Sequence, residues 1–323
     1  MVDKLYNFRP ILLIIIIPIL FSCASTQQKQ SDSRDAVFYK GRGMEYDSKG
    51  QYDQAISDYT KAIELNPRDA KCYMLRGIAY AEKKEYDQAI SDLSKAVEIN
   101  PKYHLFYGVR GVTYFQKGQY DRAISDYTKA LEINPRDYKT YDNRGNAYRE
   151  KGEYDHAISD HNKALEINPR DDKTYNLRGL AYGGKGQHDQ AISDFNKAIE
   201  INPRFAEAYH NRGNAYYSKG EYEQAISDYT EALKINSKYV KAYNNRGVAY
   251  YSKGQYDQAI SDYTKVIEIN PRDALAYYNR GRAYHLKRDY NKSWEDVNKA
   301  QSLGYQVPQE FINDLRKVSG RQN

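Results

Sequence analysis

The sequence predicts an all-α solenoid of eight helical hairpins, and three observations support this fold class. A 34-residue pattern recurs without a gap from position 36 to position 307. A fixed period of this length is typical of stacked repeats rather than of a domain with a single core. Small residues recur inside each copy, and Gly and Pro recur just after its first and second helices, as in paired helices that approach closely. The copies begin at Ala36, Ala70, His104, Tyr138, Asp172, Ala206, Val240 and Ala274.

Each copy is expected to hold a first helix over about positions 2–14 of the repeat and a second over about positions 18–30. Gly at position 15 ends the first helix in most copies, because glycine adopts the left-handed conformation at little cost. Lys84 and Arg288 replace this Gly, so their turns are expected to be less regular. Gly at position 8 and the Ala usual at positions 20 and 27 let the two helices approach, and the Pro usual at position 32 precedes the next copy.

The spacing of Gly, Tyr, Ala and Pro within each copy resembles that of the tetratricopeptide repeat. The resemblance covers positions 36–307, which is about five sixths of the 323 residues. It implies a right-handed α-α superhelix whose first helices line a concave groove. In this family, that groove binds extended peptides or a helix of a partner protein.

The chain begins with a basic segment and a short apolar run, which together resemble a lipoprotein signal peptide. The apolar run covers positions 11–21 and is shorter than the about 20 residues that span a bilayer. It ends in LFSC at positions 20–23, which resembles the lipobox of bacterial lipoproteins. The resemblance implies removal of residues 1–22 and acylation of Cys23 with fatty acids such as palmitate. Because Ala24 follows, it also implies an outer-membrane anchor facing the periplasm. An ordinary signal peptide with an incidental Cys is the alternative.

Two further segments flank the repeats. Residues 23–35, which include the acylated Cys, are rich in Ser and Gln and are predicted to form a flexible tether. Residues 308–319 begin with Pro308 and are predicted to form a helix that caps the last repeat, with a partner-binding amphipathic helix as the alternative. Residues 320–323 are expected to be a disordered tail. The apolar residues of the capping helix are Phe311, Ile312, Leu315 and Val318.

Every copy has Arg at position 7 and Asp at position 23, one on each helix. The planar guanidinium group suits a fixed two-point contact with a carboxylate, so we predict structural ion pairs that set the register of each hairpin. A row of arginines that binds an anionic partner is the alternative. The pairs are Arg42/Asp58, Arg76/Asp92, Arg110/Asp126, Arg144/Asp160, Arg178/Asp194, Arg212/Asp228, Arg246/Asp262 and Arg280/Asp296.

The sequence shows no catalytic or cofactor-binding pattern. The formal net charge is only +6, from 49 basic and 43 acidic residues that are interspersed, which is typical of a solvated surface rather than of a nucleic-acid interface. Motifs for phosphate loops, zinc proteases and nucleophile elbows are absent. His161 and His188 stand where other copies have Tyr, and Cys72 stands at a packing position. We therefore predict no enzyme, no cofactor, no metal, no nucleic acid and no small-molecule substrate.

The resemblance implies that repeat positions 2, 5, 6, 9, 12 and 13 contact the partner, and these positions vary here while the scaffold does not. In repeats six to eight they are mostly Asn and Tyr, which offer amide groups and rigid aromatic area to an extended chain. The alternative is that they are ordinary consensus residues of the family. The predicted main groove comprises His210, Asn211, Asn214, Tyr217, Asn244, Asn245, Tyr251, Tyr278, Asn279 and Arg282. A predicted secondary apolar groove comprises Met74, Ile78, Val112 and Phe115.

These features together predict a lipid-anchored, non-catalytic scaffold or adaptor that binds other proteins in the bacterial envelope. One alternative is an assembly factor of the pilotin type, or a regulatory subunit of an envelope enzyme or secretion system. A weaker alternative is an intracellular co-chaperone. His210, Asn214 and Asn245 match part of the family's clamp for C-terminal carboxylates, but Leu275 and Asn279 stand where that clamp needs cations.

Overall fold

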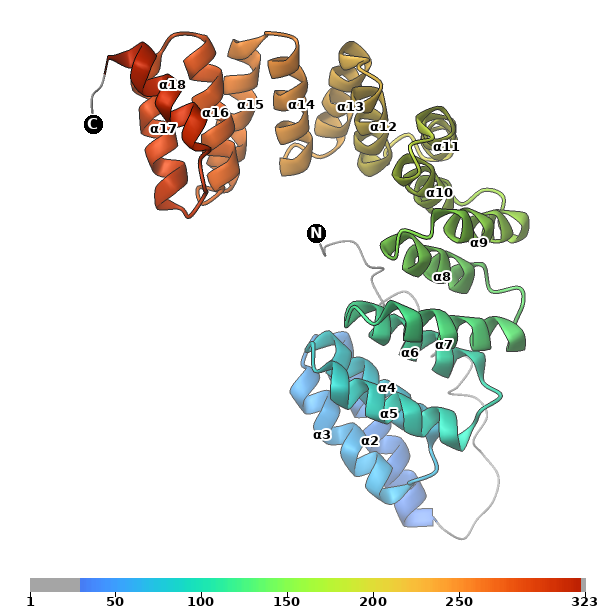
Figure 1. Cartoon of the computed structure of the whole chain (residues 1–323). Helices are drawn as coiled ribbons and strands as arrows, with labels where there is room; N and C mark the ends of the chain where they lie inside the picture. The colour runs from blue at the N-terminus through green and yellow to red at the C-terminus, as the bar shows by residue number, and fades with distance from the viewer. Residues whose placement is uncertain (1–29, 321–323) are drawn as a thin grey trace. The chain divides into compact units, whose positions relative to one another are not determined.

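The computed structural model describes residues 30–320 and forms two compact units, the first ending at Lys151 and the second beginning at Gly152. Every helix or strand assigned in these residues is an α-helix, which confirms the all-α solenoid of helix-turn-helix repeats (Figure 1). The first unit holds α2 (Gln30–Ser48), α3 (Tyr52–Leu65), α4 (Ala70–Glu82), α5 (Tyr86–Ile99), α6 (His104–Gln116), α7 (Tyr120–Ile133) and α8 (Tyr138–Glu150). The second unit holds α9 (Tyr154–Ile167), α10 (Asp172–Gly184), α11 (His188–Ile201), α12 (Ala206–Ser218), α13 (Tyr222–Ile235), α14 (Val240–Ser252), α15 (Tyr256–Ile269), α16 (Ala274–Leu286), α17 (Tyr290–Ser302) and α18 (Gln309–Ser319).

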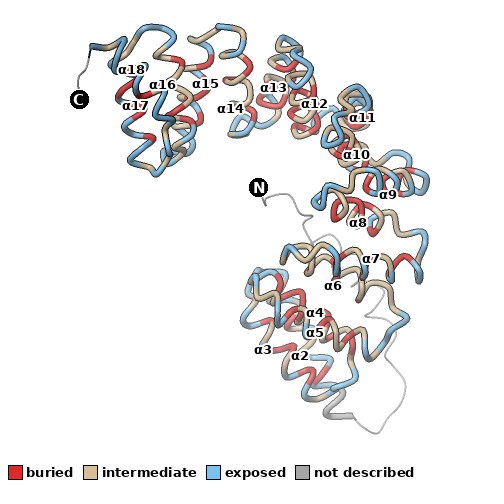
Figure 2. Tube along the Cα trace, viewed as in Figure 1, coloured by how far each residue is buried: buried red, intermediate tan, exposed pale blue. Residues whose placement is uncertain are grey.

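Within each unit, the helices pack in chain order. The first and second helices of a repeat contact each other, and the second helix also contacts the first helix of the next repeat, as α3 does with α2 and α4. First helices of adjacent repeats touch as well, for example α4 with α6 and α12 with α14. The buried residues follow these facing sides along each unit (Figure 2). A core of this kind grows by addition of repeats rather than around one centre.

The Gly at position 8 lies beneath the side chain at position 24 of the second helix, which is an aromatic ring in most repeats and Leu93 or Val297 in repeats two and eight. A β-carbon placed on Gly213 would lie 2.7 Å from Cε1 of Tyr229, and the same distance would separate a β-carbon on Gly111 from Cε1 of Tyr127. Real β-carbons do not approach other atoms so closely, so any larger residue would push the helices apart. Glycine at this position therefore sets the spacing within the hairpin.

The turn after each first helix has a left-handed residue at position 15, with φ of +73° at Gly50 and +78° at Gly220. Lys84 and Arg288 also adopt φ of +64° there. The Lys84 N–H donates to the Ala81 oxygen at 2.9 Å, as glycine does in the other turns. The expectation of less regular turns at these two residues is therefore wrong. The packing of the flanking helices holds the turn in one conformation at a cost in backbone strain.

The two ends of the array differ. The predicted flexible tether is wrong in its last six residues, because α2 begins at Gln30 and no Gly or Pro interrupts the chain before Lys40. The C-terminal helix α18 covers the last repeat, where Ile312 and Leu315 pack against Trp294 and Val297. The predicted signal peptide and Cys23 lie outside the described residues. No helix within residues 30–320 is long and apolar enough to cross a membrane.

Candidate functional site

In every repeat that lies within one unit, the Arg at position 7 and the Asp at position 23 form a two-point contact inside the hairpin. Arg42 Nε lies 2.6 Å from Asp58 Oδ2, and Nη2 lies 2.8 Å from Oδ1. Arg246 and Asp262 are arranged in the same way, at 2.8 and 2.7 Å. Arg144 belongs to the first unit and Asp160 to the second, and their contact stays a prediction. The same contact occurs in the pairs Arg76/Asp92, Arg110/Asp126, Arg178/Asp194, Arg212/Asp228 and Arg280/Asp296.

From the second repeat on, these arginines also reach the preceding repeat. Arg76 Nη1 donates to Thr60 Oγ1 at 2.9 Å, and Arg246 Nη1 donates to Thr230 Oγ1 at 2.9 Å. The hydrogen bond with Asp92 raises the pKa of Arg76 against the opposing effect of burial. With their N–H groups committed to two helices, these arginines hold the stack together and are not available to an anionic partner. The Thr, Ser or Asn that recurs at position 25 is the sequence signal for this bond, and the pattern of Arg and Asp alone does not predict it.

The repeated Lys at position 14 joins neighbouring repeats by a second ion pair. Lys83 Nζ lies 2.8 Å from Asp53 Oδ1, and Lys219 Nζ lies 2.8 Å from Asp189 Oδ1. In both cases the carboxylate belongs to the preceding repeat and is well exposed to solvent. Exposed pairs of this kind contribute little each, but every repeat boundary within a unit has one. The remaining pairs are Lys117/Asp87, Lys151/Asp121, Lys185/Asp155, Lys253/Glu223 and Lys287/Asp257.

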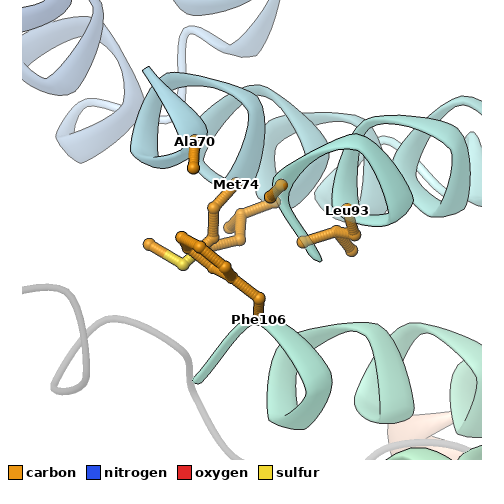
Figure 3. Close-up of a cluster of buried hydrophobic side chains, with 6 residues drawn as sticks. Ala70, Met74, Leu93 and Phe106 are labelled. Atoms are coloured by element: carbon orange, nitrogen blue, oxygen red, sulfur yellow. The ribbon is translucent and has the colours of Figure 1, made fainter. Parts of the chain in front are cut away.

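In the first unit, the predicted apolar groove is largely core. The side chains of Met74 and Ile78 are only 5% and 7% exposed, and they pack against Phe106 of the next repeat (Figure 3). Val112 and Phe115 are partly buried against Ala147 and Tyr127. The prediction of a groove is therefore wrong for Met74 and Ile78. Positions 5 and 9 face the first helix of the next repeat. A large apolar side chain there fills the packing interface between adjacent repeats, which we call the seam.

In the second unit, two predicted groove residues are buried as well. His210 is 6% exposed and Tyr278 is 8% exposed, so neither is open to a partner, and the prediction is wrong for both. Tyr278 lies beneath the C-terminal cap, with its ring centroid 4.8 Å from that of Tyr305 and 5.8 Å from that of Phe311. The cap thus covers position 5 of the last repeat, as the next first helix does elsewhere.

His210 anchors a hydrogen-bonded network between repeats six and seven. Asn245 Nδ2 lies 3.0 Å from His210 Nε2 and donates to Asn214 Oδ1 at 2.7 Å. The Tyr229 hydroxyl donates to the same Asn214 oxygen at 2.8 Å. In the preceding seam, Asn211 Nδ2 donates to Asn176 Oδ1 at 2.9 Å. Buried polar groups need such hydrogen-bond partners, so these side chains stabilise the packing of adjacent repeats. Only the donors and acceptors that make no bond within the chain can bind a ligand.

The polar side chains that stay partly exposed lie on α12, α14 and α16. Asn211, Asn245 and Asn279 occupy position 6 of three successive repeats. Arg282 stacks on Tyr251, with its guanidinium carbon 4.8 Å from the ring centroid, and it contacts no carboxylate within the described residues. We call these five residues the amide–arginine face: Asn211, Asn245, Asn279, Tyr251 and Arg282. Tyr217, whose hydroxyl lies 3.1 Å from Ser252 Oγ, and Asn244 are partly exposed beside it.

Cys72 and His161, which depart from the repeat pattern, are both buried. Burial raises the pKa of the Cys72 thiol to about 12, which keeps it protonated and unreactive at neutral pH. Its Sγ donates to Asp69 Oδ2 at 3.4 Å, within the cap of α4. Within residues 30–320, no three His, Cys, Asp or Glu side chains gather in a way that would hold a metal ion. His161, at a Tyr position, is fully buried.

Models of the tetratricopeptide repeat match the chain over nearly the whole array. The matched segments are 36–69, 70–103, 105–137 and 240–273 for one model, 145–186, 184–220 and 213–254 for a second, and 126–158 and 262–295 for a third. Each describes the repeat, which is a protein-interaction module, and none describes an enzyme. No curated protein matches the chain.

Solved structures with the same fold come from several bacteria. A tetratricopeptide-repeat protein from Parabacteroides merdae is 23% identical, with a TM-score of 0.59, and the match covers 78% of this chain and 99% of that one. PilF from Pseudomonas aeruginosa is 21% identical, with a TM-score of 0.55 and coverage of 66% and 97%. The C-terminal part of a repeat protein from Cytophaga hutchinsonii is 20% identical, with a TM-score of 0.56 and coverage of 74% and 98%. With repeat models over residues 36–295 and an all-α stack of hairpins, the chain belongs to the tetratricopeptide-repeat family.

Proposed function

We propose that this chain is a non-catalytic adaptor that binds an extended segment of a partner protein along the amide–arginine face. The observation behind the proposal is the column of partly exposed Asn side chains at position 6 of repeats six to eight. An extended peptide offers an N–H or C=O group at short, regular intervals, and an amide side chain pairs with either. One Asn per repeat therefore suits recognition of backbone rather than of one particular sequence.

The hydrogen bonds already made decide what each Asn can offer. Asn245 directs both amide hydrogens to His210 and Asn214, so only its oxygen is left to accept a bond from a backbone N–H. Asn211 has one amide hydrogen left after its bond to Asn176. Asn279 has no such bond within the described chain and can both donate and accept. Of the three amides, the one nearest the C-terminal cap, Asn279, is therefore the most available to a partner.

Arg282 adds a charge preference at that end. Its guanidinium carbon lies 4.8 Å from the ring centroid of Tyr251 and 5.7 Å from that of Tyr278. An arginine held against an aromatic ring loses little further entropy when it pairs with a carboxylate. The partner segment should therefore have an acidic residue or a free C-terminus where it meets repeat eight.

We further propose that Cys23 is acylated and holds this adaptor at the outer membrane, facing the periplasm. Support comes from the basic start, the short apolar run and LFSC at positions 20–23. Two or more acyl chains give stable anchoring, which one chain does not. Incorporation of labelled palmitate that Cys23→Ala abolishes is the expected result, and continued incorporation in that variant would refute acylation at this residue.

Photo-crosslinking from the face tests the adaptor proposal. A photoreactive amino acid at Asn279 is expected to capture a partner protein in the native envelope. The matched control places it at Ser261, which is exposed on the second helix of repeat seven. A partner captured equally well from both positions, or one whose capture survives Arg282→Ala combined with Asn245→Ala, would contradict the proposal. Capture of an assembly complex or of an envelope enzyme would favour the corresponding alternative role.

A further inference from the structure

The first helix of the array has an uncovered face that is buried in the later repeats. At position 3, Phe38 is 57% exposed, and at position 2, Val37 is 54% exposed. Position 10 of the same helix is Glu45, which is also exposed. In repeats two to eight, the residues at positions 3 and 10 are buried against the preceding repeat. They are Cys72, Phe106, Thr140, Thr174, Ala208, Ala242 and Ala276 at position 3, and Ala79, Thr113, Ala147, Ala181, Ala215, Ala249 and Ala283 at position 10.

Four residues form one stripe along this face of α2: Arg34, Phe38, Gly41 and Glu45. Their spacing of four, three and four residues places them on a single side of the helix. A β-carbon on Gly41 would meet nothing within 4 Å, so the stripe has a shallow point beside Phe38. The opposite end of the array is closed by α18, whereas this end leaves its largest apolar side chain in solvent. Solenoids need a polar outer surface at each end.

We infer that the α2 stripe is covered by the same stripe of a second copy of this chain. The order of charge and size along the stripe is complementary to itself in an antiparallel pairing. With the twofold axis between Phe38 and Gly41, Phe38 lies over Gly41 of the second copy. In the same register, Arg34 lies beside Glu45 of the second copy, and both contacts occur twice.

The contact is small and should be weak. One helix face is well below the surface of about 1,600 Å² that a stable interface usually buries, so the dissociation constant is expected to be roughly micromolar. Glu45 makes one ion pair in the single chain, with Lys49 at 2.5 Å, and both groups are well exposed. It therefore remains accessible to a second arginine.

Charge exchange provides the test, using the full chain in mild detergent and sedimentation to measure its mass. The wild-type chain is expected to dimerise as its concentration rises through the micromolar range. Arg34→Glu alone and Glu45→Arg alone each place like charges in contact twice, and each should weaken dimerisation by roughly tenfold. An equimolar mixture of the two variants should form a mixed dimer, because both of its contacts then join opposite charges.

Two further samples complete the test. The double variant Arg34→Glu with Glu45→Arg should regain the wild-type dissociation constant. Phe38→Ser should weaken dimerisation both in the wild-type chain and in this double variant. Arg272→Glu, an exposed residue far along the second unit, is the matched control and should change nothing. Helix content measured by circular dichroism shows that each variant is folded. A wild-type chain that stays monomeric, or a mixture no more associated than its components, would overturn the inference.

Discussion

Repeats two and three of the first unit and repeats six and seven of the second share one scaffold but close their seams differently. In the first pair, Met74 and Ile78 pack with Phe106 in an apolar cluster. In the second pair, position 3 is the small Ala242, and the buried His210 has its ring 5.0 Å from that of Tyr239. The same backbone thus accepts either an apolar or a polar seam.

The side chains at the seam, and not the ion pairs of the hairpins, decide this difference. The two-point contact of Arg with Asp is the same in both regions, at 2.7 and 2.8 Å for Arg110 with Asp126 and at 2.7 and 2.6 Å for Arg212 with Asp228. Because the scaffold does not depend on the seam, the side chains at positions 3, 5, 6 and 9 are free to serve packing in one region and recognition in another.

The largest expected effect is at the apolar seam between repeats two and three. Phe106→Ala removes a buried ring that packs against Met74, and it should lower the free energy of unfolding by about 3–5 kcal/mol, measured by urea denaturation. Binding of a partner to the second unit should not change. Ala242→Gly, at the same position of the polar seam, is the control and should cost only about 1 kcal/mol. A loss below about 1 kcal/mol for Phe106→Ala would show that the apolar seam contributes little.

The shared scaffold is tested by breaking one ion pair in each unit. Asp126→Ala and Asp228→Ala each leave a largely buried guanidinium group without its carboxylate, at an expected cost of about 3 kcal/mol. The two losses should agree, because the geometry of the two pairs agrees. Losses that differ by more than about 1.5 kcal/mol would show that the seam alters the scaffold. Asp257→Ala, which removes only an exposed partner of Lys287, serves as the control.

Partner binding should respond only to the polar region. Arg282→Ala removes a cation that contacts no carboxylate within the described chain, and it should weaken binding of an acidic partner segment by roughly tenfold. Because Arg282 makes no ion pair there and loses only its contacts with the rings of Tyr251 and Tyr278, the free energy of unfolding should fall by no more than about 1 kcal/mol. The affinity of the crosslinked partner can be measured by calorimetry, with Arg272→Ala as a control for charge alone. An unchanged affinity would exclude Arg282 from the binding surface.

One carboxylate in each unit, Asp69 in the first and Asp228 in the second, should change stability with pH in opposite directions. Burial raises the pKa of Asp228 in spite of Arg212, so ionisation costs stability as the pH rises above the ordinary value of about 3.9. For Asp69, burial opposes ionisation, but hydrogen bonds from Lys40 and Cys72 outweigh it and lower the pKa. Its stabilising effect is therefore present above about pH 3.9 and is lost as the pH falls through the lowered pKa.

Asn variants make this contrast measurable. Between about pH 3 and pH 5, the stability advantage of the wild type over Asp69→Asn should grow with pH, whereas its advantage over Asp228→Asn should shrink. Urea denaturation at several pH values gives both differences. Slopes of the same sign would mean that the two carboxylates do not experience opposite environments.

The fold could be predicted from the sequence because recurring residues mark where each repeat and each helix begins and ends. The period, the Gly beneath the Tyr229 ring and the pairing of Arg42 with Asp58 all follow from residues that recur at fixed positions. The seam was harder to predict because its partners lie one repeat apart. Whether Met74 is core depends on Phe106, and whether Tyr278 is exposed depends on the cap, which the 34-residue pattern does not contain.

The smallest expected effect concerns the turn that both units share. Lys84 in the first unit and Arg288 in the second each adopt φ of +64°, where glycine stands in most repeats. A side chain with a β-carbon is strained in this conformation, so Lys84→Gly and Arg288→Gly should each raise the free energy of unfolding by up to about 1 kcal/mol. Gly118→Ala, at the same position of repeat three, should lower it by a similar amount. Equal shifts at Lys84 and Arg288 would show that the turn is independent of the seam beside it. A gain at one residue and a loss at the other would show that the polar and apolar regions differ in their scaffold as well as in their exposed side chains.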